Sequence, residues 1–163
     1  MKKQIILLTN LFLFLGSLAL NAQDAQQECN IKYNLFKGDY QSKKYEDAYP
    51  NWMYLMDNCQ KLSINVYKLG DKLAQVRFKN AENKTEAAAL VKRVYTQRLE
   101  NYPTNDPAKA HSNYATFLIK NKLASDQEVF EILQLAYNLD PTRMSVKNIY
   151  RYFQGITDTY KDT

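Results

Sequence analysis

Apolar residues recur along this 163-residue chain at spacings of three and four from about residue 29 onward. That period is typical of amphipathic α-helices, and the alternation of β-branched residues that would indicate strands is weak. Glycine and proline number only four each, so little of the chain is available for loops. The pattern predicts seven helices, at residues 30–43, 45–58, 63–80, 85–101, 108–121, 126–138 and from about 143 onward.

The apolar stripes predict which side of each helix packs inward. The stripe of the first helix contains Ile31, Leu35 and Phe36. The stripe of the second helix contains Ala48, Trp52, Leu55 and Met56. The last helix has the longest stripe, which consists of Ile149, Tyr152, Phe153, Ile156 and Tyr160. We expect this last stripe to pack on the sixth helix.

Polar residues mark the starts of several helices. Ser63 and Thr85 stand at the starts of the third and fourth helices, where capping residues are favoured. Ser125, followed three residues later by Glu128, has the spacing of a capping box before the sixth helix. Pro50 is tolerated in the second helix only if that helix begins near Glu46, so that the missing N–H falls in the first turn.

The breaks between helices are short, which predicts that successive helices are antiparallel neighbours. The hairpins repeat at roughly 35–45 residues, within the range of helical solenoids. We therefore expect an all-α fold in which antiparallel hairpins stack as a solenoid.

The first 22 residues have the layout of a secretory signal peptide. Lys2 and Lys3 form a positive n-region, residues 5–20 are nearly all apolar, and Ala22 offers a small residue for cleavage before Gln23. The alternative is an uncleaved membrane anchor, but a run of about sixteen residues is shorter than the roughly 20 that a spanning helix needs. We expect residues 1–22 to be removed and residues 23–163 to form one domain.

Charge decides little about the partners of this chain. The formal net charge is +5, or +3 without the two lysines of the n-region, and no five like charges are adjacent. The 13 tyrosines could suggest a nucleic-acid partner, but many recur at helical spacing, which is ordinary core use. Export also argues against a nucleic-acid partner, and we expect none.

Few residues suggest chemistry. His111 is the only histidine, and a lone histidine near a helix start is most often a surface residue. The adjacent carboxylates Glu46 and Asp47 do not face each other on a helix and suit its N-terminus. No glycine-rich phosphate loop is present, and one histidine with two cysteines makes a zinc site improbable. We expect no enzyme, cofactor, metal or small-molecule substrate.

Two stretches resemble the tetratricopeptide repeat. In the first, Leu35 matches a large apolar position of helix A, the turn at residues 44–48 ends in Ala48, and Trp52 and Leu55 match the packing positions that follow. In the second, residues 130–141 resemble helix B and its closing Leu-Asp-Pro, with Leu133, Ala136 and Pro141 at the expected spacing. The resemblance implies a right-handed TPR-like solenoid over residues 23–163.

The sequence departs from the repeat motif at four positions. Phe36 and Phe117 replace its small residue, and Asp39 and Lys120 replace its aromatic residue. Residues 63–101 match the motif only as a helical hairpin.

The chain as a whole is similar to exported tetratricopeptide proteins of Bacteroidota. The residues that carry this likeness are the Leu-Asn-Ala-Gln that ends the signal segment, Cys29, residues 44–48, Trp52 and the Asn58-Cys59 pair. The resemblance implies a protein of the periplasm, the outer membrane or the cell surface.

Cys29 and Cys59, the only cysteines, come at the start of the first helix and the end of the second. An antiparallel hairpin places these two ends side by side, and an exported chain occupies an oxidising compartment. The sequence therefore predicts a Cys29–Cys59 disulfide. A redox-active pair is the less favoured interpretation, because no Cys-x-x-Cys motif is present.

Surface recognition is the class of function that remains once catalysis, metal binding and nucleic-acid binding are set aside. Solenoids present a concave face built from their A helices, and we expect another envelope protein or a peptide to bind there. The register of the motif assigns the following residues to that face: Tyr33, Lys37, Tyr40, Gln41, His111, Tyr114, Leu118 and Lys122. The alternative is a structural subunit, or the N-terminal part of a larger helical assembly, that packs through its seventh helix.

Overall fold

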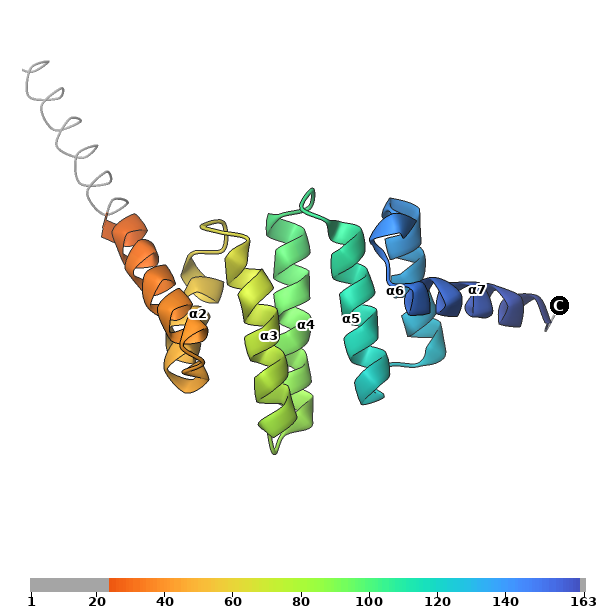
Figure 1. Cartoon of the computed structure of the whole chain (residues 1–163), viewed down its shortest axis with the longest axis horizontal. Helices are drawn as coiled ribbons and strands as arrows, with labels where there is room; N and C mark the ends of the chain where they lie inside the picture. The colour runs from red at the N-terminus through yellow and green to blue at the C-terminus, as the bar shows by residue number, and fades with distance from the viewer. Residues whose placement is uncertain (1–23, 162–163) are drawn as a thin grey trace, which may run out of the picture. The chain divides into compact units, whose positions relative to one another are not determined.

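The structure is a computed structural model that describes residues 24–161, with side chains described as far as residue 157. Every regular element of this part is helical, as predicted (Figure 1). Residues 24–41 form the first helix. The others are α2 (Tyr45–Asn58), α3 (Asn65–Asn80), α4 (Lys84–Asn101), α5 (Pro107–Asn121), α6 (Asp126–Leu139), the 3-10 turn η1 (Pro141–Arg143) and α7 (Val146–Lys161). The predicted signal peptide lies outside the described residues.

The described chain divides into two compact units at Leu62 and Ser63. The first unit is the hairpin of the helix at residues 24–41 with α2. The second unit contains α3 to α7, in which α3 pairs with α4, α5 pairs with α6, and α7 packs mainly on α6 (Figure 1).

Five completely buried side chains form the core of the first unit. They are Phe36 from the first helix and Ala48, Trp52, Leu55 and Met56 from α2. The stripe predicted for α2 is therefore confirmed. The stripe predicted for the first helix is wrong at two positions, since Ile31 and Leu35 are about half exposed, at 50% and 49%.

A disulfide joins the two helices of the first unit, as predicted. Cys29 and Cys59 are bonded, with their Cα atoms 5.8 Å apart, and both are buried. The sequence predicted that the first helix begins at about residue 30, just after Cys29. In the structure residues from 24 onward are already helical, so Cys29 lies within the helix. The same two helices meet again where the Lys32 ammonium lies 5.4 Å from the centre of the Tyr54 ring.

Pro50 is the sixth residue of α2, which begins at Tyr45 as predicted, so it lies beyond the first turn. The residue has no N–H, so it cannot make the helical bond to the carbonyl four residues earlier. The prediction that Pro50 belongs to the first turn is therefore wrong.

Aromatic pairs join neighbouring helices of the second unit. Phe78 of α3 meets Phe117 of α5 edge to face, with ring centres 5.1 Å apart. Tyr152 of α7 stacks on both Phe130 and Tyr137 of α6, at 5.6 and 4.6 Å. The predicted packing of α7 on α6 is thus confirmed at Tyr152.

The other apolar residues predicted to pack inward from the last helix are only partly buried. Ile149 and Ile156 are partly buried and pack against the core of this unit. Phe153 is 47% exposed, and the side chain of Tyr160 lies outside the described residues.

Caps define the helix starts of the second unit. The Ser125–Glu128 capping box is confirmed: Ser125 N–H donates to Glu128 Oε2 at 2.8 Å, and Glu128 N–H donates to Ser125 Oγ at 3.3 Å. The fourth helix begins one residue earlier than Thr85, after Asn83, whose side chain accepts the Glu86 N–H. The third begins at Asn65, two residues later than predicted, and Ser63 Oγ accepts the Asn65 N–H at 3.2 Å.

A buried polar contact ties α7 to α5. The side-chain amide of Asn148, 1% exposed, donates to the Ser112 carbonyl at 2.8 Å and lies 2.9 Å from the hydroxyls of Ser112 and Thr116. Because Asn148 and Ser112 are shielded from water, losing the amide removes a buried donor from Ser112.

We expect the loss of the disulfide to destabilise the first unit. Replacing both cysteines by serine opens a loop with a sequence separation of 30, which in the loop-entropy model costs about 3–4 kcal/mol. Trp52, the only tryptophan, is completely buried in this unit, so its fluorescence follows the unfolding in denaturant. Reductant should lower the unfolding midpoint of the native chain and leave the double-serine variant unchanged. Equal midpoints for both proteins would contradict the expectation.

Asn148→Ala should lower the free energy of unfolding of the second unit by about 1–3 kcal/mol, because the buried Ser112 loses this donor. Gln154→Ala is the matched control on the same helix, since Gln154 is exposed and its side-chain amide donates to the Tyr150 hydroxyl at 3.1 Å. This control should change stability by less than about 0.5 kcal/mol. Denaturant unfolding followed by far-UV circular dichroism measures both, and equal effects would overturn the assignment.

Candidate functional site

The predicted binding residues of the first unit share one side of the helix at residues 24–41. Lys37 and Gln41 are exposed, and Tyr33 and Tyr40 are half-buried. The Tyr40 ring packs on Phe36 and Tyr45, with ring centres 6.2 and 5.7 Å apart. This side of the helix therefore combines partly open tyrosine rings with an amine and an amide.

The predicted residues of the second unit lie on α5 and at its end, and only some of them are open. His111 and Tyr114 are half-buried, and the Tyr114 ring lies 4.9 Å from that of Tyr95. Leu118 is only 8% exposed, so its side chain belongs to the core of this unit. Lys122 is exposed and ends α5 with a left-handed backbone, φ 54°.

Burial lowers the pKa of His111, which favours the neutral imidazole near pH 7. Among the described residues, no side chain makes a hydrogen bond or an ion pair with it. A general base needs a neighbour that orients it and a proton within reach. The described contacts of His111 provide neither.

A buried polar cluster lies between α3 and α4, and the sequence analysis missed it. Asp71 accepts a hydrogen bond from Gln75 at 2.8 Å, and Arg98 is 7% exposed and donates to the Asn105 carbonyl at 3.3 Å. Burial raises the pKa of Asp71, and the hydrogen bond from Gln75 and the charge of Arg98 partly offset this rise. Burial, with Asp71 nearby, also raises the pKa of Tyr95. The two hydrogen bonds lie within α3 and between α4 and the loop that follows it, and the opposite charges of Asp71 and Arg98 attract across the hairpin.

The spacing of the buried residues of α4 could have revealed that Arg98 is buried. The residue falls four positions after Val94 and seven after Val91, on the buried stripe of α4. A charged side chain on such a stripe indicates a buried polar contact.

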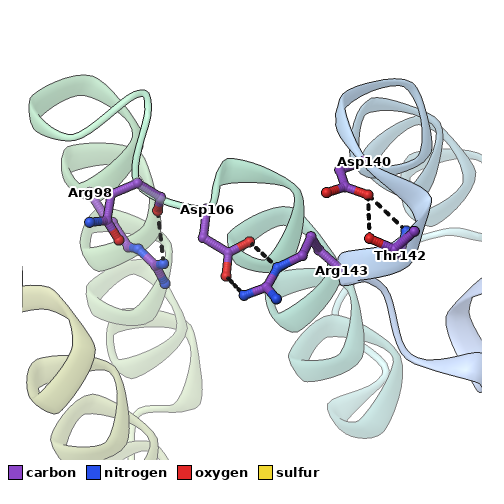
Figure 2. Close-up of polar contacts among 6 residues, drawn as sticks. Arg98, Asp106, Asp140, Thr142 and Arg143 are labelled. Carbon is purple, nitrogen blue, oxygen red and sulfur yellow. Dashed lines mark hydrogen bonds and ion pairs between the residues drawn. The ribbon is translucent and has the colours of Figure 1, made fainter.

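An ion pair joins two loops at one end of the second unit (Figure 2). The Arg143 guanidinium donates to both carboxylate oxygens of Asp106, with Nε 3.1 Å from Oδ1. Beside it, Asp140 accepts hydrogen bonds from the backbone N–H and the hydroxyl of Thr142 at 2.9 and 2.6 Å. Asp106, Asp140 and Arg143 line a shallow depression of about 360 Å³ together with Leu139. The pair fixes the turn after α6 against the start of α5.

Large apolar side chains remain exposed on the last two helices. Leu135 and Leu139 of α6 are 51% and 52% exposed. Val146, Tyr150 and Phe153 of α7, at i, i+4 and i+7, are 83%, 64% and 47% exposed. We call these three residues the α7 stripe. An apolar row that the fold leaves in water is typical of a surface that binds another molecule.

In the part of the chain that the structure describes, no three His, Cys, Asp or Glu side chains gather as a metal site. Within the same residues, no helix has the length and apolar character needed to span a bilayer. Comparison with protein-family models, with curated proteins and with solved structures finds no match to this chain.

The hydrogen bonds and charge of Arg143 lower the pKa of Asp106. A carboxyl whose folded pKa is depressed stabilises the fold above its unfolded pKa, and that contribution is lost as the pH falls through the folded pKa. We expect Arg143→Gln to raise the pKa of Asp106 toward its ordinary value and to reduce the loss of stability in acid. Carboxyl carbon NMR titration measures this directly. Lys147→Gln, which removes an exposed charge from α7, is the control, and an Asp106 pKa unmoved by Arg143→Gln would refute the account.

Proposed function

We propose that this protein is a non-catalytic protein–protein interaction module of the bacterial cell envelope. In this proposal, residues 23–163 form a right-handed TPR-like solenoid of antiparallel hairpins, exported by a cleaved signal peptide. The pairing of α3 with α4 and of α5 with α6 supports the stacked hairpins. The signal-like layout of residues 1–22 supports the compartment, and the resemblance to exported tetratricopeptide proteins of Bacteroidota is part of the proposal.

The α7 stripe is the observation that carries the proposal. Burying a large apolar side chain contributes about 1.5–3 kcal/mol, so three such residues in a row are a costly surface to leave in water. A partner that covers them recovers this free energy, whereas catalysis requires no such row. Aromatic residues, two of the three here, are also enriched at protein interfaces.

The disulfide supports export. Disulfides persist in oxidising compartments such as the periplasm and are rare in the bacterial cytosol. The Cys29–Cys59 bond therefore agrees with the signal-like segment of residues 1–22. We propose that the mature protein occupies the periplasm, the outer membrane or the cell surface.

Two faces could hold the partner. The first is the set of helix-A residues, taken in each unit by itself. In the first unit these are Tyr33, Lys37, Tyr40 and Gln41, and in the second they are His111, Tyr114 and Lys122, because the side chain of Leu118 is buried. The second is the α7 stripe, which would make the protein a subunit of a larger helical assembly. The greater exposure of apolar area on α7 favours the second face.

Site-specific photo-crosslinking in living cells tests the proposal. A photoreactive phenylalanine analogue replaces Tyr150 or Phe153 on the stripe, Lys37 or Lys122 on the helix-A face, and Thr96, which is exposed on α4, as the control. We expect adducts with one recurrent envelope protein from positions 150 and 153, several-fold above those from position 96. Adducts from 37 or 122 instead would assign docking to the helix-A face. Equal yields from all five positions would refute the interaction module.

A further inference from the structure

A pocket of about 270 Å³ lies where α5, α6 and α7 meet in the second unit. Its apolar wall consists of Ile119 from α5 and Val129, Phe130 and Leu133 from α6. Leu133 and Val129 are buried, so this wall is part of the packed core and is held in place by it. The pocket is separate from the predicted helix-A residues, since none of them lines it.

Gly155 shapes the pocket. A Cβ at this position would collide with the Phe130 ring, so only glycine lets α7 approach α6 this closely. The Phe130 ring is also stacked with Tyr152, with planes inclined by 13°. Two residues of α7 therefore lie against this aromatic wall.

Arg151 brings a positive charge to the α7 side of the pocket. The side chain is half-buried, and among the side chains described, up to residue 157, none makes a hydrogen bond or ion pair with the guanidinium. A carboxylate is the group that best complements a guanidinium beside an apolar wall, because it accepts two parallel hydrogen bonds from it. The complementary group on a ligand is therefore an anion of planar shape.

Asp126 lines the same pocket from the first turn of α6. Its exposed carboxylate repels a second negative charge on that side. The ligand should thus carry one carboxylate, placed toward α7, and not a cluster of acids.

The volume limits the apolar part of the ligand. Pockets for drug-sized molecules and cofactors typically measure about 300–1,000 Å³. A pocket of about 270 Å³ with one fixed aromatic wall suits a single apolar side chain.

We propose that this pocket binds an apolar side chain of a partner polypeptide whose neighbouring residue places a carboxylate on Arg151. The inference rests on the proposed function, because it names the chemistry of a partner that an interaction module would hold. The partner therefore contains an apolar–acidic dipeptide in an exposed segment.

The test uses blocked peptides and isotope-labelled protein, purified as the producing cell processes it. The probe is acetyl-Gly-Leu-Asp-Gly-amide, and the matched probes replace its Asp by Asn or its Leu by Ala. We expect saturable amide shifts at Val129, Phe130 and Gly155 with the first probe, and at least about tenfold weaker binding of the other two. No saturable shift at these amides would overturn the proposal.

Variants separate the guanidinium from charge in general. Arg151→Gln should weaken binding of the Leu-Asp probe about tenfold, and Arg151→Lys, which keeps the charge but loses the forked geometry, should weaken it less. Lys147→Gln removes a charge from the same helix outside the pocket and should leave affinity unchanged. Equal losses in Arg151→Gln and Lys147→Gln would reduce the effect to nonspecific attraction and refute the assignment.

The two proposals fail separately. If in-cell adducts form at the α7 stripe but the peptides do not bind, the interaction module stands and the pocket does not contribute. If the peptides bind as expected but no position yields an adduct, the pocket stands as a peptide site and the proposed envelope partner is wrong.

Discussion

Packing between short helices is the constraint on which the rest of this structure depends. The helices from α2 onward have 14 to 18 residues, a length that is marginal for an isolated helix in water. Each must bury its apolar stripe against a neighbour, and completely buried alanines, such as Ala74, Ala110, Ala115 and Ala136, allow close approach. Where no neighbour covers a helix, as along the outer side of α7, the same requirement leaves an apolar row for another molecule to cover.

Features governed by neighbours in sequence were predictable. The bounds of α2, the Ser125–Glu128 capping box and the all-helical class follow from periodicity and from residues a few positions apart. The Cys29–Cys59 bond was predictable because a hairpin brings the two ends together regardless of the details of its packing. The extent of the first helix was not, because it already covers residues 24–29, ahead of the predicted start at Asn30.

Features governed by the contact between helices were not predictable. Periodicity identifies Leu35 and Phe36 as apolar but cannot decide which of two adjacent positions faces α2, and the structure buries only Phe36. The motif register likewise assigned Leu118 to a binding face, although the packing of the second unit encloses it. Arg98, Arg151 and Gly155 gain their roles only from the residues opposite them, on other helices or in a loop, and no local pattern records those neighbours.

The claim that the α7 stripe is covered by another protein in the cell can be measured by hydroxyl-radical footprinting. Tyr150 and Phe153 react readily when exposed to water, and Tyr67, which is completely buried, serves as the internal control. The account predicts that both stripe residues are protected in isolated envelopes and become reactive in the purified protein, while Tyr67 stays protected in both. Equal reactivity of Tyr150 and Phe153 in the two preparations would contradict it.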